Sequence, residues 1–401
     1  MQNLKIFAKT VEPEAMEQIS LLLAQSAFRD CKVRIMPDVH AGKGCVIGFT
    51  ADLGDRVIPN IVGVDIGCGM LVTKLCSDPI DLGHLDTCIR ASVPYGRNVH
   101  ETVVTPFPVL KTLRCYSALA DPERIERSIG TLGGGNHFIE IDRDEDGMQY
   151  LVIHTGSRSL GKQVADYYQN LAFDLLRGKR GLQLEQDALI KSLTASGKSA
   201  EIQPALQKLR REFPGRNGSL PKALCYLERE WRDAYLYDMQ ICQAFACENR
   251  RQIRNALVSG LGLPIEHAEE ASFETVHNYI DPESNIVRKG AIDASAGKRV
   301  LIPLNMRDGC IVAIGKGNED WNCSAPHGAG RLMSRTQAKK NLSMEAYQME
   351  MADIFSTSVS EETLDEAPGA YKPCEEILEL IGETVTVERI IKPVYNFKAS
   401  E

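Results

Sequence analysis

The sequence predicts an α+β fold in which a helical region is inserted between strands. Short apolar runs bounded by glycine occur before residue 155 and after residue 276, whereas 160–260 has helical periodicity. Residues suited to metal or phosphate are spread from Asp65 to His327 without a linker between them. We therefore expect residues 1–401 to fold as one domain around one site.

The composition is that of an ordinary globular protein. The 401-residue chain is 43% hydrophobic and 25% charged, which supports a well-buried core. Its formal net charge of −8 argues against a protein that coats nucleic acid non-specifically, because such binding requires an excess of Lys and Arg. Basic clusters remain at 288–289, 298–299 and 331–340. Each of them suits either a solvated face or a contact with an anion.

Cysteine usage and hydropathy indicate a cytoplasmic protein without membrane contact. The twelve cysteines have no framework spacing and no Cys-x-x-Cys pair, so we expect most of them to be reduced and buried. Residues 1–9 lack the apolar core of a signal peptide, and no apolar run is long enough to cross a bilayer.

The first third of the chain places polar side chains in glycine-rich loops. A helical pattern at 14–27 precedes the sequence MPDVHAGKG at 36–44, which leads into a strand at 45–50. Asp, His and Lys among glycines suit either phosphate or metal, but this motif alone is not specific.

Asp65 and Cys68 give a more specific signal. A predicted strand at 61–64 runs into the sequence DIGCG, whose glycines permit a tight bend. Because the two side chains are three residues apart in this bend, both can face one cation. A lone cysteine is more often part of a core, but an Asp-x-x-Cys flanked by glycines favours a metal site.

Two further strands each place a histidine beside a glycine loop. The sequence GGGNHFIEI leads through a loop into a strand, in which alternation sends His137 and Ile139 to one face. Phe138 and Glu140 then face the other side. The next strand ends at His154, which is followed by the loop TGSRS.

Residues 160–260 are predicted to be mainly helical. A helix at 160–177 is followed by a polar stretch, 178–218, which we expect to be a flexible insertion that carries no candidate site residue. A long helix is predicted to begin after Pro221, because apolar residues then recur at steps of three and four. This stripe consists of Leu224, Leu227, Trp231, Tyr235, Met239, Cys242 and Ala246.

The last third contains two more histidines in polar surroundings. His277 lies in a strand-like segment, and His327 begins the sequence HGAGR. Small residues let a backbone approach a ligand, and the Arg331 guanidinium suits phosphate oxygens. An isolated HGAGR would also fit a glycine-rich turn with a buried histidine.

The candidate residues together favour chemistry at phosphorus. Five of the eight histidines lie in the segments above, namely His40, His137, His154, His277 and His327. With Asp65 and Cys68 they supply enough ligands for two metal ions, which is the usual equipment for phosphoryl transfer. The thiolate favours zinc or iron over manganese on softness alone.

The motifs resemble, in the same order, those of the RtcB family of GTP-dependent RNA-splicing ligases. The matching stretches are MPDVHAGKG, VGVDIGCGM, GGGNHFIEI, HTGSRSLG, HNY, RKGA and HGAGR. The resemblance extends from about residue 4 to Lys398 and lapses chiefly in 178–218. It implies a catalytic domain with mixed sheets around a central cleft for metal and nucleotide.

This resemblance implies an enzyme that joins RNA ending in a 2′,3′-cyclic phosphate or 3′-phosphate to RNA with a 5′-hydroxyl, using GTP and manganese. His327 attacks the α-phosphorus of GTP, the guanylate passes to the RNA 3′-phosphate, and the 5′-hydroxyl displaces GMP. The thiolate alone would favour zinc or iron, but the family's preference for manganese implies manganese here. The resemblance also admits an archease-type activator, and we expect a monomer.

Two sets of site residues follow from the resemblance. Two Mn²⁺ ions per chain share Cys68, with Asp65 and His137 completing one position and His154 and His277 the other. The predicted GTP-binding residues are Asn136, His137, Phe138, Ile139, Glu140, His277, Asn278, Pro303, Leu304, Asn305, Met306, Cys310, His327, Gly328, Ala329, Gly330 and Lys398.

Two other functions use the same residues. A metallophosphatase or phosphodiesterase would bind the same metals and use water as the nucleophile. A relative without ligase activity would bind RNA ends only. A covalent GMP distinguishes the ligase from both.

One loop departs from the family pattern. Many members have Pro-Gly-Ser-Met-Gly where this chain has the sequence PLNMRD at 303–308. We hypothesise that Asn305 replaces the lost serine contact and that Arg307 faces phosphate while Asp308 holds its guanidinium. The alternative is an Arg-Asp pair that closes a surface turn.

Overall fold

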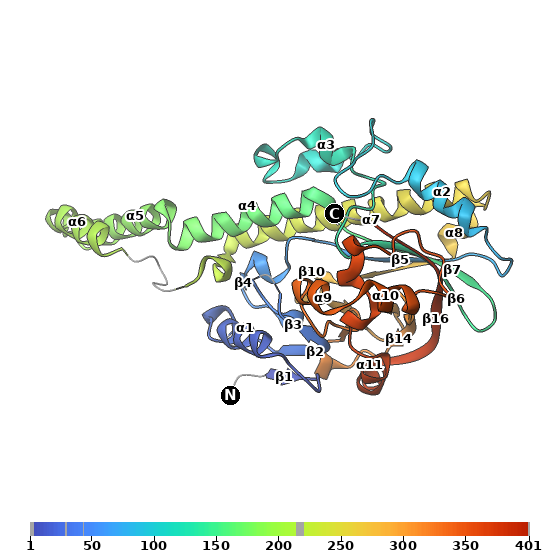
Figure 1. Ribbon diagram of the computed structural model, residues 1–401. Helices are drawn as coiled ribbons and strands as arrows, with labels where there is room; N and C mark the ends of the chain where they lie inside the picture. The colour runs from blue at the N-terminus through green and yellow to red at the C-terminus, as the bar shows by residue number, and fades with distance from the viewer. Residues whose placement is uncertain (1–3, 29, 43, 214–219, 400–401) are drawn as a thin grey trace.

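The largest sheet has seven strands and every neighbouring pair in it is antiparallel. It belongs to a computed structural model that describes residues 4–28, 30–42, 44–213 and 220–399 (Figure 1). In spatial order the strands are β13 (Arg299–Asn305), β14 (Gly309–Gly315), β16 (Val385–Lys398), β6 (Phe138–Arg143), β7 (Gln149–Thr155), β5 (Gly69–Lys74) and β9 (Ser272–Val276).

A second sheet has five strands, of which only β1 and β2 pair in parallel. Its order is β1 (Leu4–Ile6), β2 (Val33–His40), β3 (Ile47–Asp52), β11 (Ile286–Lys289) and β10 (Asn278–Ile280). Two short ribbons complete the strands: β4 (Arg56–Val57) with β8 (Leu227–Glu228), and β12 (Ala291–Asp293) with β15 (Ser324–Pro326). His277 is the single residue between β9 and β10, so the two sheets meet at a predicted site residue.

The helices lie mainly around the seven-stranded sheet, and α4 and α7 run side by side (Figure 1). Their bounds are α1 (Pro13–Leu23), α2 (Leu82–Ser92), α3 (Pro122–Glu126), α4 (Arg158–Leu176), α5 (Lys179–Ala195), α6 (Ile202–Glu212), α7 (Arg229–Gly260), α8 (Ile265–Glu270), α9 (Arg335–Asn341), α10 (Met344–Glu350) and α11 (Cys374–Ile381). Among the described residues, no helix has the length and apolarity needed to span a membrane.

The fold confirms the predicted α+β class, but two predicted elements are wrong. The long helix begins at Arg229 rather than after Pro221, because Leu227 and Glu228 pair with β4 and this pairing overrides the helical periodicity. Residues 61–64 do not form a strand. A 3₁₀ turn covers Pro59–Ile61, with the proline at its start, where the missing N–H costs nothing.

The predicted insertion at 178–218 contains α5 and α6, which project away from the sheets (Figure 1). Residues 214–218 of that prediction lie outside the described residues. Residue 43 of the predicted phosphate or metal loop does so too. The flexibility of the insertion stays a prediction.

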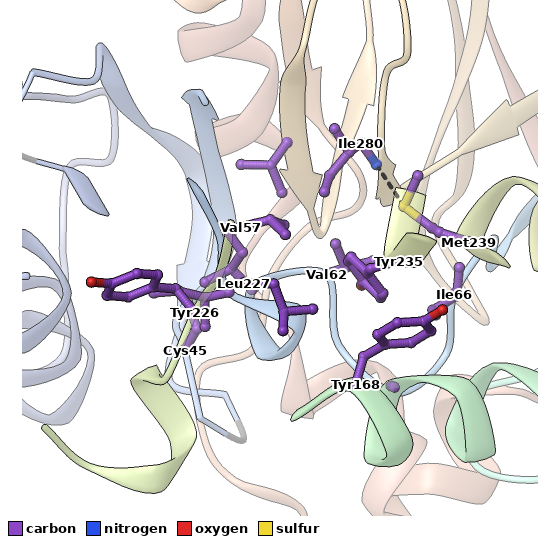
Figure 2. Close-up of a cluster of buried hydrophobic side chains, with 14 of the residues drawn as sticks. Cys45, Val57, Val62, Ile66, Tyr168, Tyr226, Leu227, Tyr235, Met239 and Ile280 are labelled. Atoms are coloured by element: carbon purple, nitrogen blue, oxygen red, sulfur yellow. Dashed lines mark hydrogen bonds between the residues drawn. The ribbon is translucent and has the colours of Figure 1, made fainter. Parts of the chain in front are cut away.

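A large apolar core holds the β4–β8 ribbon against α4 and α7 (Figure 2). The rings of Tyr168 on α4 and Tyr235 on α7 meet edge to face, with centroids 5.2 Å apart. The backbone N–H of Ile280 donates to the sulfur of Met239 at 3.4 Å. This core anchors α7 and β10 next to the loop that carries the predicted metal ligands.

Most cysteines have the role expected of them. All twelve are free, and seven of them are buried. Burial of Cys45, Cys225 and Cys242 within the largest apolar core agrees with the prediction that they act as small hydrophobes.

Candidate metal and nucleotide site

The register of the seven-stranded sheet brings four predicted ligands to one edge. β6 begins directly after His137, and β5 begins directly after Cys68. β7 ends one residue after His154, and β9 ends directly before His277. Because β6, β7, β5 and β9 are consecutive and antiparallel, these ends lie next to one another.

Cys68 lies in the middle of the resulting cluster. Its Sγ is 3.3 Å from Nε2 of His154 and 3.5 Å from Nε2 of His137. Asp65 extends the cluster on one side, with Oδ2 3.0 Å from Nε2 of His137. His277 extends it beside His154, with ring centroids 5.3 Å apart. All five predicted metal ligands therefore lie together.

Two of the histidines turn Nε2 toward the cluster. Nδ1 of His137 lies 2.9 Å from the carbonyl oxygen of Leu132, and Nδ1 of His154 lies 3.1 Å from that of Asn136. Because a carbonyl only accepts, each Nδ1 carries a proton, and Nε2 of each ring is the nitrogen that a metal would contact. Burial, and then the charge of neighbouring groups, lower the pKa of His154 and of His277 well below the usual value. Both imidazoles are therefore neutral at pH 7, which is the form that binds metal.

The two other ligands complete a set suited to a divalent cation. Burial raises the pKa of Asp65, but the hydrogen bond to His137 and the charge of Arg158 outweigh it and lower that pKa to about 2. Burial and the charge of Asp65 raise the pKa of the Cys68 thiol well above its usual value. A bound cation would reverse this effect and favour the thiolate, because the thiolate is the form that ligates.

Arg158 is a residue near the cluster to which the sequence analysis gave no role. Its Nη1 lies 3.4 Å from Nδ1 of His137, and its backbone has a left-handed φ of 56°. Gly133 has a left-handed φ of 80°, and a Cβ there would stand 1.8 Å from the same Nη1, so another residue would be strained and would displace the guanidinium. The sequence HTGSRSLG could have indicated this arginine, since it follows the His154 strand directly.

His327 is held by a buried carboxylate. Nδ1 of its ring donates to Oδ2 of Asp38 at 2.6 Å, and its backbone N–H donates to the same oxygen at 3.0 Å. Asp38 is fully buried in β2, whereas the side chain of His327 is 18% exposed. The hydrogen bond fixes the tautomer, so Nε2 carries the free lone pair. Gly330 is required at this contact, because a Cβ would stand 2.5 Å from the Asp38 carbonyl oxygen.

The ring of His327 also borders the metal cluster. Its centroid lies 5.0 Å from that of His277. The pairing of Ala291 with Pro326 in the β12–β15 ribbon produces this position, because it places the HGAGR segment next to the segment that follows His277. The predicted nucleophile and the predicted metal ligands thus lie next to each other.

A cavity of about 280 Å³ opens beside His327. The predicted residues that line it are Asn136, Phe138, Glu140, His154, Pro303, Leu304, Asn305, Met306, His327, Gly328, Ala329, Gly330 and Lys398. His40, Ile47, Met70, Gly309, Arg331, Arg335, Glu366 and Tyr371 line it as well. A second hollow, at the β4–β8 ribbon, contains none of the predicted residues.

Five predicted nucleotide residues do not line this cavity. His137 and His277 belong to the metal cluster, and the Ile139 side chain lies in an apolar core because it points to the opposite face of β6. Asn278 donates to the carbonyl oxygen of Asp65 and accepts from the N–H of Gly290. Cys310 is buried beside Asp142, and both burial and that carboxylate raise its pKa well above the usual value.

Glu366 joins the two ends of the cavity wall. Its carboxylate pairs with Lys398 at the end of β16. It also lies 3.3 Å from Nη1 of Arg331 in the HGAGR sequence. Arg335 lies 2.7 Å away, and the Tyr371 hydroxyl donates at 2.6 Å. The cations of 331–340 that pair with this segment therefore do not form a free basic patch.

Replacing Glu366 with glutamine is expected to destabilise the protein by about 3 kcal/mol, because it leaves the buried Lys398 ammonium unpaired. Burial raises the pKa of Glu366, but Lys398, Arg335 and Arg331 outweigh it and lower that pKa to about 2, from 4.5. A lowered pKa contributes stability above pH 4.5 that is lost as the pH falls toward 2. Urea unfolding between pH 7 and pH 3 measures this, and the variant should lose less stability over that range than the wild type.

The matched control is Glu362→Gln, an exposed position on the same segment. It is expected to unfold like the wild type at both pH values. A Glu366→Gln protein as stable as this control would show that the ion-pair network does not hold the cavity wall.

The loop that departs from the family pattern is occupied by its own hydrogen bonds. Oδ1 of Asn305 accepts from the N–H groups of Arg307 and Asp308, and its Nδ2 donates to Asp308. Arg307 donates to Asp308 at 2.8 Å and lies 3.6 Å from Glu350, in a separate hollow. These contacts favour the interpretation as a surface turn over the hypothesis that Arg307 faces phosphate.

Comparison with known sequences identifies the family. The family model for RtcB, described as tRNA-splicing ligase RtcB, matches residues 22–118 and 115–399. The chain belongs to the RtcB family. The family predicted from the motifs is thereby confirmed.

Curated RtcB relatives match over nearly their whole length. RNA-splicing ligase RtcB of Escherichia coli K12 is 30% identical, over 96% of this chain and 94% of its own. RNA-splicing ligase RtcB1 of Escherichia coli ATCC 25922 is 31% identical over the same shares. The tRNA-splicing ligase RtcB of Aeropyrum pernix is 26% identical over 89% of this chain and 85% of its own.

Proposed function

We propose that this RtcB-family protein is an RNA ligase that joins a 2′,3′-cyclic phosphate or 3′-phosphate end to a 5′-hydroxyl end and consumes GTP. The observation that carries the proposal is the position of His327, whose free Nε2 lies between a set of metal ligands and a cavity. Its relatives' names, RNA-splicing and tRNA-splicing ligase, support the same activity. A phosphatase that uses water has no need of this histidine.

The ligand set fits two manganese ions with Cys68 shared between them. Asp65 and His137 would complete one position, and His154 and His277 the other. This division is supported by the contacts, because Asp65 lies beside His137 and His154 lies beside His277. When bound, the two cations would offset the negative charge of the triphosphate that otherwise repels a nucleophile.

The first step forms a bond between Nε2 of His327 and the α-phosphorus of GTP and breaks the bond to the β-phosphate, which releases pyrophosphate. Nδ1–H keeps its hydrogen bond to Asp38, and the carboxylate stabilises the positive charge that develops on the ring. Gly328 and Gly330 let the backbone approach the phosphate.

The guanylate then moves to RNA. An oxygen of the RNA 3′-phosphate attacks the phosphorus, and the bond to His327 breaks, so the ring regains its lone pair. The 5′-hydroxyl oxygen attacks the activated 3′-phosphate, loses its proton and displaces GMP, which leaves a 3′,5′-phosphodiester.

Glu140 and Lys398 suit the guanine base. Both line the cavity, and Asn396 donates to the Glu140 carboxylate. Burial raises the pKa of Glu140 to about 7, although Asn396 and Lys398 lower it. A carboxylate there accepts from the N–H groups of guanine, and Lys398 donates to an acceptor of the base.

The test is a ligation assay with two RNA oligonucleotides, one ending in a 3′-phosphate and one beginning with a 5′-hydroxyl. With GTP and Mn²⁺ the ligase gives one longer strand, and without GTP it gives none. Loss of the 3′-phosphate without joining would identify a phosphatase instead. Binding without any change in either strand would identify an RNA-end-binding protein.

We also propose that the protein works as a monomer in the reducing cytoplasm. The absence of disulfides among its twelve cysteines supports the compartment. An archease-type activator is a further proposed partner, and its addition to the ligation assay tests whether the rate rises.

Replacing Asp38 with asparagine is expected to slow guanylylation by a factor on the order of 10²–10³, because the developing charge on His327 loses its carboxylate. Both hydrogen bonds that the Asp38 carboxylate accepts come from His327, so Asp38 acts as a positioning residue. The KM for GTP should therefore stay near the wild-type value while kcat falls. An Asp38→Asn protein with a raised KM for GTP and an unchanged kcat of guanylylation would contradict this role.

Replacing Arg307 with alanine is expected to leave guanylylation and ligation within about twofold of wild type, since an exposed ion pair contributes only ~0–1 kcal/mol. The contacts of Arg307 are Asp308 and Glu350 rather than the cavity. A titration of both GTP and RNA checks this. A marked rise in either KM would restore the hypothesis that Arg307 contacts phosphate.

A further inference from the structure

The helical arm, residues 177–222, has no role in the site described above. Its helices α5 and α6 project from the body, and no other part of the described chain lies beside their far ends (Figure 1). Of the predicted site residues, none falls in this range. The arm is therefore a large surface whose use is unexplained.

Charge is distributed unevenly between this arm and the rest of the protein. The 46 residues of the arm contain ten Lys or Arg and four Asp or Glu, a formal charge of +6. Since the whole chain carries −8, the other 355 residues carry −14. The arm is thus a basic projection on an acidic body.

Four cations of the arm are exposed and have no ion-pair partner among the described residues. Lys191 on α5 and Lys208, Arg210 and Arg211 on α6 are all exposed, and no carboxylate among the described residues lies within ion-pair distance of them. Cations beside the cavity differ, because Arg331 and its neighbours pair with acidic side chains. The arm therefore offers free charge where the site does not.

The two helices pack against each other. Leu206 of α6 and Gln186 of α5 are both buried. Lys208 and Arg211 are three positions apart, so they lie on one face of α6. A helix of 17 residues such as α5 is about 25 Å long, which is enough to follow several phosphates of a strand.

We propose that the helical arm binds the phosphate backbone of the RNA substrate at a distance from the reacting ends. This proposal rests on the proposed RNA-ligase function and adds a binding surface to it. An acidic body repels RNA, so a basic projection supplies the attraction that the body lacks. Contacts of Lys and Arg with phosphates carry no sequence information, which suits an enzyme that selects its substrate by the chemistry of the ends.

The experiment measures RNA binding directly. The variant replaces Lys191, Lys208, Arg210 and Arg211 with glutamine, and the probe is a fluorescent 30-nucleotide RNA with a 3′-phosphate. Its dissociation constant is measured by anisotropy over a range of salt concentrations. We expect the variant to bind RNA at least tenfold more weakly than wild type. The slope of log K against log salt concentration should also be shallower by about 3, because each of the four lost phosphate contacts contributes about 0.7 to that slope.

Two further variants keep the result interpretable. A matched control replaces four exposed cations of the body, Lys74, Lys111, Arg143 and Lys316, with glutamine and has the same change of charge. It should bind RNA within about threefold of wild type. A variant that exchanges Lys and Arg at the four arm positions keeps the charge and should bind like wild type.

The outcomes separate this proposal from the function on which it rests. If the arm variant binds RNA as tightly as wild type, with the same salt dependence, the arm proposal is wrong, and the exposed Leu184 and Ile190 would point to a protein partner instead. An equal loss in the body control would also overturn it. If the wild type binds RNA through the arm but joins no ends, the ligase function fails and the arm proposal stands. Transfer of GMP to His327 should be equal in all four proteins.

Discussion

Replacing Cys68 with alanine is expected to empty both metal positions and to reduce ligation below detection. The Cys68 sulfur lies 3.3 Å from Nε2 of His154 and 3.5 Å from Nε2 of His137, so one side chain serves both halves of the cluster. Without it each proposed metal position would keep two of its protein ligands and lose the only thiolate of the set. Alanine has no donor atom, and its methyl group leaves a gap beside buried imidazoles.

Elemental analysis of the purified proteins measures this effect. We expect two metal ions per wild-type chain and fewer than about 0.2 per Cys68→Ala chain after dialysis. The matched control is Cys247→Ala, an exposed cysteine on α7, which should keep the wild-type metal content. Two metal ions retained by the Cys68→Ala protein would show that the thiolate is not shared.

Replacing His327 with alanine is expected to abolish covalent guanylylation while the metal content stays unchanged. Asp38 orients the His327 ring, whose Nε2 is the proposed nucleophile, and His327 is not one of the proposed metal ligands. Its neighbour His277 is buried within the ligand set and cannot replace it without leaving the cations. Incubation with α-labelled GTP followed by denaturing electrophoresis measures the retained label.

His84→Ala serves as the control for this variant, because His84 lies on α2 and contacts the backbone of Gly260 rather than the site. It should be labelled like the wild type. A labelled His327→Ala protein would place the nucleophile elsewhere and remove the basis of the proposed mechanism.

The metal cluster could be predicted from the sequence because its ligands occur at strand ends. Cys68, His137 and His154 each lie within two residues of a strand end, beside a glycine loop. Antiparallel pairing of neighbouring strands then brings these ends to one edge without any further information. The sequence did not show the pairing order of the strands, which the structure supplies.

The partner of the nucleophile could not be predicted. Asp38 and His327 are 289 positions apart, and nothing in the local pattern of either segment connects them. The sequence at 36–44 suits a phosphate or metal loop, yet residues 36–40 belong to β2 and Asp38 orients a histidine instead. Glu366 and Tyr371 were missed for a similar reason, since the sequence DEAPGAYK carries no spacing typical of a site.

Local patterns also failed where tertiary contacts decide the structure. The apolar stripe from Leu224 continues the periodicity of α7, but Leu227 pairs with Val57 in a ribbon instead. Asn305 was expected to face the nucleotide as a serine would, whereas both ends of its amide are bound within the turn. Composition does not reveal which hydrogen bonds a polar side chain has already made.

The most direct test of the account is to find the atom that carries GMP. Wild-type protein is incubated with GTP and Mn²⁺ in the absence of RNA, digested under neutral conditions and mapped by mass spectrometry. The account predicts a guanylylated peptide that contains His327, with a linkage that is stable to base and broken by mild acid, as expected of a nitrogen–phosphorus bond. GMP on any other residue, or no covalent GMP in a protein that joins RNA ends, would contradict it.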